Sequence, residues 1–392
     1  MKLTVKSLSP CSLEMVAASG LFGEYDAGST SSKGDMNKGS SYPPTTEWII
    51  YVDQSKASLD RGGTATLDAL VGLVPPNKVQ IVPCVLPKNT NSKKKAPWIR
   101  CISTTKGGTP NLDIGGVDSV DKCYRALTKH LQVKNVSLQM CDCLKYKYMG
   151  NNLLESGKVS AAIGSYQKAL AACPKNNKKQ QGVVLLLRSS AYLQQAQSHK
   201  SILQKAVNEW KLPQTDVLQA MLQDAVSLST SSGTTSVSLS FLNTLTKNGA
   251  RQKAQLRKIQ YRHGLYQNSL LQAAQDSLRA TELLPTYSTA FLRAGEVLNE
   301  LWRIKESRLY YERAMELLQR QQLQRLKDTT VETSSDNKKE TEDVGKGPTT
   351  LADLNAVFQN LDVRQELLDQ ALSNQYWSTD SVRLALDVAV KI

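Results

Sequence analysis

The segment Cys143–Pro174 constrains the fold of this chain more than any other stretch of it. Small residues at Gly150 and Ala162 lie where two antiparallel helices must approach closely, and large apolar residues supply the facing surfaces. Those apolar positions are Tyr146, Met149, Leu153, Tyr166 and Ala169. Pro174 ends the second helix because proline has no N–H to donate. The pattern predicts a helix hairpin, and such a hairpin buries both faces only when neighbouring hairpins stack on it.

Two further helix pairs are expected between about residues 137 and 326. Val183–Ala196 has the pattern of the first helix of a second hairpin, and Leu271–Pro285 has the pattern of its partner helix. Thr289–Leu318 predicts a third hairpin, in which the pattern is carried by Phe291, Gly295, Leu298, Tyr311 and Ala314.

The second hairpin is interrupted by an insertion at 197–262. Its sequence predicts helices around Ile202–Trp210 and Thr215–Leu228, followed by a loop rich in Ser, Thr and Gly. We expect the insertion to lengthen the two helices of the hairpin and to add a projection.

These spacings resemble tetratricopeptide repeats (TPR). The resemblance implies a mainly α fold, a TPR helical solenoid of three repeats, with a concave surface that binds a peptide segment of a partner protein. It is strongest with the three-repeat TPR domains of heat-shock co-chaperones, which hold the acidic C-terminal tail of Hsp70 or Hsp90 in a two-carboxylate clamp. Lysine, asparagine and arginine side chains suit carboxylates by charge and by donor geometry.

The resemblance assigns candidate peptide-binding residues one by one. Lys147 and Asn151 occupy the first-repeat clamp positions, and Arg293 occupies the third-repeat arginine position. The chain departs from the family at Leu187, where the second-repeat asparagine is missing, and at Thr289, where the third-repeat lysine is missing. These losses make a standard grip on an acidic tail doubtful, because each charge-assisted bond contributes about 1.5–3 kcal/mol.

Arg188 is the fourth candidate for peptide binding, beside Leu187 on the second repeat. A structural explanation competes with the functional one. Gly150 can serve helix packing alone, and Arg188 and Arg293 can pair with acidic neighbours.

A small α/β domain of unassigned family is expected at 45–135. Residues 1–44 are rich in Ser, Gly, Lys and Asp and predict a disordered leader. Apolar runs predict strands near Trp48–Val52, Lys78–Leu86 and Trp98–Ser103. The same region predicts two helices, one capped by Thr64 and ending at Leu73, and one at Val117–Leu131.

This α/β domain is the only place where chemistry is expected, and its motifs are weak. Asp53, Ser55 and Ser58 partly resemble the D-x-S-x-S metal motif of von Willebrand A domains, but Ala57 replaces the second serine. The 62–64 turn can offer N–H groups to a phosphate, although a helix start explains the same residues. No catalytic set of a nucleophile, a general base and a residue that orients the base can be assembled from the sequence. We therefore expect no enzyme, no cofactor and no metal site.

The C-terminal part divides into a linker and a helical segment. Residues 327–350 are charged and poor in apolar residues, which predicts a disordered linker. Residues 351–392 predict two or three short amphipathic helices. They can form a small core of their own, resembling ubiquitin-binding modules, or pack as a cap on the preceding helices, which we favour.

Net charge and cysteine usage bound the partners and the compartment. The formal charge of +14 favours anionic partners. A basic run of Lys247, Arg251, Lys253, Arg257, Lys258 and Arg262 makes an RNA- or ribosome-associated scaffold the alternative function. We favour a solvated helix face there, because the run is taken to lack interleaved aromatic residues for stacking. Seven scattered cysteines, no secretory signal and no membrane span predict a cytoplasmic protein, although an organellar transit peptide is hard to exclude.

Overall fold

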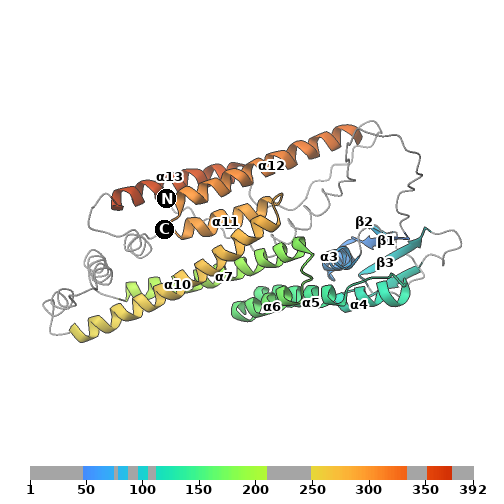
Figure 1. Cartoon of the computed structure of the whole chain (residues 1–392), viewed down its shortest axis with the longest axis horizontal. Helices are drawn as coiled ribbons and strands as arrows, with labels where there is room; N and C mark the ends of the chain where they lie inside the picture. The colour runs from blue at the N-terminus through green and yellow to red at the C-terminus, as the bar shows by residue number, and fades with distance from the viewer. Residues whose placement is uncertain are drawn as a thin grey trace. The chain divides into compact units, whose positions relative to one another are not determined.

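A computed structural model describes residues 47–74, 78–86, 96–104, 112–209, 249–332 and 351–372. These residues are mainly helical and include a small four-stranded sheet (Figure 1). It divides into two compact units. Among the described residues, the sheet unit holds those up to 153 together with 164–184, and the helical unit holds 154–163 and those from 185 onward.

The sheet has the strand order β2-β1-β3-β4. Its strands are β1 (Trp48–Asp53), β2 (Val79–Cys84), β3 (Trp98–Ser103) and β4 (Leu112–Gly115). β1 pairs in parallel with β2 and antiparallel with β3, which pairs antiparallel with β4. The three predicted strands are confirmed. β4 was not predicted, because four residues are too few to establish an alternating pattern.

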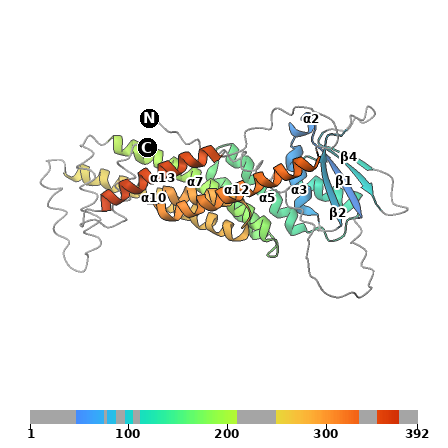
Figure 2. The same cartoon turned by 90° about the horizontal axis from the view of Figure 1, so that it is seen from above.

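Two helical segments connect and cover these strands (Figure 2). α2 (Lys56–Leu59) and α3 (Gly63–Leu73) lie between the parallel strands β1 and β2, and α3 packs against both strands. The prediction that Thr64 caps α3 was wrong. The chain enters the helix through Gly62, whose φ of 89° is a left-handed conformation, and no side chain caps the helix.

The helix predicted at 117–131 is present in two parts. α4 (Val120–Arg125) begins after Ser119, whose hydroxyl accepts a hydrogen bond from the Lys122 amide, and it continues as the π-helical turn η1 (Ala126–His130). α4 packs against α3, so both helices and the sheet share one apolar core around Ile50, Leu70 and Ile99.

The opening motif forms the two predicted helices, α5 (Leu138–Glu155) and α6 (Val159–Ala172). A Cβ atom added to Gly150 would lie 2.5 Å from the ring of Tyr166, so only glycine allows this approach. Tyr166 and Ala169 are fully buried, as predicted, but Met149 is 53% exposed, so its assignment to the buried apolar face was wrong.

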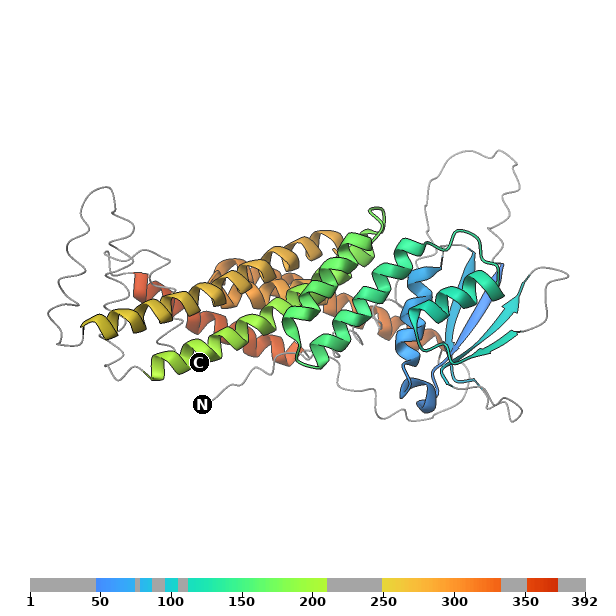
Figure 3. The same cartoon turned by 90° about the horizontal axis from the view of Figure 1, so that it is seen from below.

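In the helical unit, α7 (Lys178–Asn208) and α10 (Gly249–Leu283) run side by side (Figures 1 and 3). Hydrogen bonds from Arg188 to Asp276 and from Ser189 to the Ala273 carbonyl confirm the predicted pairing of segments far apart in sequence. The helix expected around Ile202–Trp210 is not separate, because α7 is continuous through it. The helix expected at Thr215–Leu228 and the Ser/Thr/Gly-rich loop lie outside the described residues.

The third predicted hairpin corresponds to α11 (Ser288–Glu300) and α12 (Ile304–Glu332). A Cβ atom on Gly295 would lie 3.0 Å from the ring of Tyr311. α12 is longer than predicted and runs past the expected start of the linker at residue 327. The rest of that linker and the predicted leader lie outside the described residues.

α13 (Leu351–Leu372) is a single helix in the described part of the C-terminal segment. Its residues Leu354, Leu361 and Leu368 join one buried cluster with Trp302 and Tyr311, so it packs on the preceding helices as the favoured prediction states. None of the helices in the described ranges is long and apolar enough to cross a membrane.

Candidate functional site

Lys147, the first candidate clamp residue, is enclosed within the sheet unit. Only 3% of the residue is exposed, and its ammonium group donates a hydrogen bond to the carboxylate of Asp68 on α3. The Leu144 side chain, on the same helix, lies against Gly72 of α3. A side chain expected to meet a ligand carboxylate thus meets a carboxylate of its own chain.

Asp68 is held by more than one donor. The Tyr148 hydroxyl lies 2.6 Å from its carboxylate and 3.0 Å from the Ala65 carbonyl oxygen. Burial by itself raises the pKa of Asp68, but the charge of Lys147 and the hydrogen bonds from Lys147 and Tyr148 outweigh it. The pKa of this carboxyl is therefore lowered, and Asp68 is ionised at neutral pH.

Asn151, one helical turn after Lys147, is also occupied. It is 6% exposed, and its side-chain oxygen accepts a hydrogen bond of 2.7 Å from the Tyr166 hydroxyl on α6. The amide predicted to donate to a peptide thus takes part in the contact between the two helices of its own hairpin.

In the helical unit, Arg188 forms a bidentate pair with Asp276. Its Nε and Nη2 atoms each lie 2.6 Å from a carboxylate oxygen of Asp276, which is 5% exposed. The hydrogen bond that Arg188 donates to Asp276 is the main reason that the pKa of Arg188 is raised. This pair joins α7 to α10.

Arg293 is 4% exposed and pairs with Glu296 on its own helix, at 2.5 Å. Its Nε atom is buried and has no hydrogen-bond partner among the described residues. Burial raises the pKa of Glu296 in spite of the nearby charge of Arg293. The two positions that depart from the family, Leu187 and Thr289, are each 5% exposed.

All four candidates are therefore buried or half-buried and bonded within the chain. The structure brings Lys147 and Asn151 together on α5, and it places Arg188 and Arg293 in the other unit. The partner of Lys147 was missed because Asp68 is 79 residues away in sequence, on a helix whose packing against α5 no local pattern announces.

The segment 53–58, which only partly resembles a metal motif, forms a turn in which Asp53 has no free carboxylate oxygen. Asp53 is 1% exposed and accepts hydrogen bonds from the Ser55 amide and hydroxyl, the Ser58 hydroxyl and the Leu86 amide. Burial raises its pKa, and these hydrogen bonds lower it further than burial raises it. Across the described ranges, no group of three or more His, Cys, Asp or Glu side chains could hold a metal ion.

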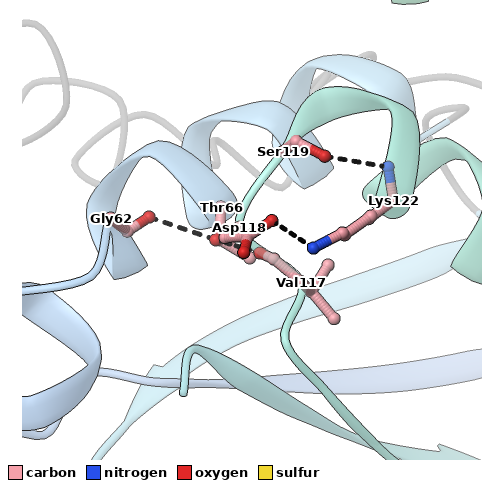
Figure 4. A network of polar contacts seen from close by, with 6 residues as sticks. All are labelled: Gly62, Thr66, Val117, Asp118, Ser119 and Lys122. Atoms are coloured by element: carbon pink, nitrogen blue, oxygen red, sulfur yellow. Dashed lines mark hydrogen bonds and ion pairs between the residues drawn. The ribbon is translucent and has the colours of Figure 1, made fainter. Parts of the chain in front are cut away.

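The glycines at 62 and 63 also have structural explanations. A Cβ atom on Gly63 would lie 2.9 Å from the Ser58 carbonyl oxygen. The Thr66 hydroxyl bridges the carbonyl oxygens of Gly62, at 3.1 Å, and Val117, at 2.5 Å, and thereby joins the beginnings of α3 and α4 (Figure 4). Asp118 pairs with Lys122 beside this bridge at 2.7 Å.

A pocket of about 390 Å³ is lined by residues 114–117 and by side chains of α4 and η1. Its ionisable lining residues are Lys122, Arg125 and His130, and its lining includes no carboxylate and no thiol. The ionisable side chains that line the pocket are thus all nitrogen bases.

The cysteines of the described ranges are free thiols. Burial raises the pKa of Cys101 and of Cys123 to about 12, so both stay protonated at neutral pH.

One surface residue was missed in the basic run. The statement that this run lacks aromatic residues was wrong, because Tyr261 lies between Lys258 and Arg262, and it is 64% exposed. Its helical spacing from Arg257 and Lys258 could have shown this from the sequence.

A scan against protein-family models found no match, and a search of the curated proteins found no relative.

Proposed function

We propose that this chain is a non-catalytic protein-binding scaffold, built from helix hairpins of the TPR type, that holds a segment of a partner protein against its helices. One repeated contact carries the proposal. Gly150 meets the Tyr166 ring and Gly295 meets the Tyr311 ring, each pair sixteen residues apart, with a fully buried alanine three residues after each tyrosine. Two copies of one packing solution are typical of a repeat architecture.

The pair α7 and α10 supports a third hairpin of the same kind. Ser189 donates a hydrogen bond from the first helix to the Ala273 carbonyl of the second, at 2.8 Å. In the last hairpin, Ser307 of the second helix donates to the Gly295 carbonyl of the first, at 2.7 Å. In both helix pairs, a serine hydroxyl thus donates a hydrogen bond to a backbone carbonyl of the facing helix.

The internal ion pairs bear on the chemistry of the ligand. An acidic tail, such as that of Hsp70 or Hsp90, would have to displace Asp68 from Lys147 before it could use this lysine. The geometry supports instead a role for Lys147, Asn151 and Arg188 in holding helices together, while Arg293 pairs with Glu296 within α11. A ligand that does not depend on these four side chains fits their internal bonding better.

Calorimetric titration of an acidic C-terminal chaperone peptide tests the tail-binding form. We expect no saturable binding by the wild-type chain. Tight binding by the wild type that is lost in Lys147→Ala and in Asn151→Ala would contradict our assignment of these residues.

The scaffold itself is tested by affinity purification followed by cross-linking of the captured partner. We expect cross-links between the partner and the helical unit. We also expect capture to fall severalfold in Gly295→Val, which separates α11 from α12, but not in Gly264→Ala, where a Cβ atom meets nothing within 4 Å. Equal capture by both variants would argue against binding through the hairpins. A cytoplasmic location stays a prediction.

A further inference from the structure

The helices α7 and α10 carry a strong excess of positive charge. α7 contains five Lys or Arg residues and no Asp or Glu, and α10 has the same balance from its start to residue 275. Contacts join the two helices at Arg188 and Asp276, at Gln195 and Ser269, and at Glu209 and Lys258, so these charges belong to one helix pair.

Carboxylates neutralise only part of this charge. Arg188 pairs with Asp276, and Lys200 pairs with Glu300 at 2.9 Å. Toward the other end of the helix pair, Lys205 and Arg257 are exposed, with no acidic partner among the described contacts. Lys258 lies 3.9 Å from Glu209, but both side chains are more than half exposed, so water screens this pair.

An aromatic ring stands among these cations. Tyr261 is 64% exposed, and it follows Arg257 and Lys258 by about one helical turn. The Arg262 guanidinium carbon lies 6.0 Å from the centre of the Tyr261 ring. Ile259, fully buried on the other side of α10, fixes which face of the helix turns outward.

We propose that this surface, made of Lys205, Arg257, Lys258, Tyr261 and Arg262, binds single-stranded nucleic acid. The cations hold phosphates, and the Tyr261 ring stacks on one base. An acidic protein segment would satisfy the cations and leave the exposed ring without a role. A duplex has its bases paired and stacked and offers the ring no free base. The inference goes beyond the scaffold function and stands independently of it.

Fluorescence anisotropy of the full chain with a labelled twelve-nucleotide oligouridine tests the proposal. Affinity should fall with salt with a logarithmic slope of about −3, since four cations contribute about 0.7 each on a single strand. Arg257→Gln/Lys258→Gln should lower the size of this slope by about 1.4. Tyr261→Ala should weaken binding by roughly 5- to 100-fold, and Tyr261→Trp should retain it.

Matched controls separate the surface from net charge and from folding. Lys305→Gln/Arg320→Gln removes the same charge from exposed positions on α12 and should leave affinity within about twofold. All the substituted side chains of the main test are at least half exposed or lie on exposed helix faces, so the far-ultraviolet dichroism should not change. An oligodeoxythymidine of equal length reports whether the sugar matters, and binding of either strand supports the proposal.

Two results would overturn it. One is the absence of binding at 50 mM salt. The other is polyglutamate or duplex binding as tight as oligouridine binding, together with no effect of Tyr261→Ala, which would make the surface a general polyanion or acidic-protein site.

Discussion

The hairpins α5/α6 and α11/α12 solve one packing problem in the same way and use their buried cations differently. In each, a glycine lets a tyrosine ring of the second helix approach the first. Just before the glycine stands a buried cation, Lys147 or Arg293. Lys147 pairs with Asp68 from the sheet fold, 79 residues away, whereas Arg293 pairs with Glu296 three residues away.

The difference teaches that a buried cation close to the packing glycine can either join distant elements or be neutralised locally. The same difference appears in the pKa values of the two partner carboxyl groups, Asp68 and Glu296. The pKa of Asp68 is lowered, because Lys147 and Tyr148 outweigh burial, while the pKa of Glu296 is raised, because burial outweighs Arg293. The surroundings of Asp68 therefore favour its ionised form, whereas the surroundings of Glu296 disfavour its ionised form.

The largest expected effect comes from filling the glycine contacts. Gly150→Ala places a methyl group 2.5 Å from a fully buried ring and should destabilise the chain by about 2 kcal/mol in urea unfolding. Gly295→Ala places it 3.0 Å from its ring and should cost less, about 1 kcal/mol.

Each substitution has a control in a helix of the same chain. At Gly164 and Gly264 a Cβ atom meets nothing within 4 Å, so alanine there should stabilise by about 0.4–1 kcal/mol. If Gly150→Ala were as stabilising as Gly164→Ala, the close approach of α5 and α6 would be refuted.

The two carboxyls should give opposite pH dependences. Because the folded pKa of Asp68 lies below its unfolded value, its contribution is present above about pH 4 and is lost as the pH falls further. Glu296 has a raised folded pKa, so its ionisation destabilises the fold as the pH rises through and above about 4.5.

Urea unfolding of the wild type, Asp68→Asn and Glu296→Gln from pH 3 to pH 7 checks both signs. Relative to the wild type, Asp68→Asn should lose least at pH 3, and Glu296→Gln should gain most at pH 7. Parallel profiles for the three proteins would contradict both assignments.

A smaller effect is expected from the tyrosine hydroxyls. Tyr166→Phe leaves the buried oxygen of Asn151 without its donor and should cost about 1 kcal/mol in the free energy of unfolding. The described contacts of Tyr311 include no hydrogen bond of its hydroxyl, so Tyr311→Phe should change stability by less than about 0.5 kcal/mol. Equal costs would show that the Asn151 contact adds nothing.

Local patterns predicted most of the fold and little of the candidate site. Apolar runs predicted three strands, and the spacing of small and large apolar residues predicted the helix pairs. Both kinds of pattern involve residues that lie near each other in the chain. β4 was too short to show a period. The partners of Lys147 and Arg188 depend on tertiary packing of segments 79 and 88 residues apart, which spacing does not encode. Tyr261, by contrast, was missed although the printed sequence contains it.

The central claim is that Lys147 serves the fold by pairing with Asp68. A double-mutant cycle in urea unfolding, with Lys147→Met, Asp68→Asn and the double variant, measures their coupling free energy. We predict at least about 1 kcal/mol, larger than the roughly 0.5 kcal/mol of a local helix pair, for which the Arg293 and Glu296 cycle is the comparison. A Lys147–Asp68 coupling below about 0.3 kcal/mol would contradict the account and return Lys147 to the role of a ligand-binding residue.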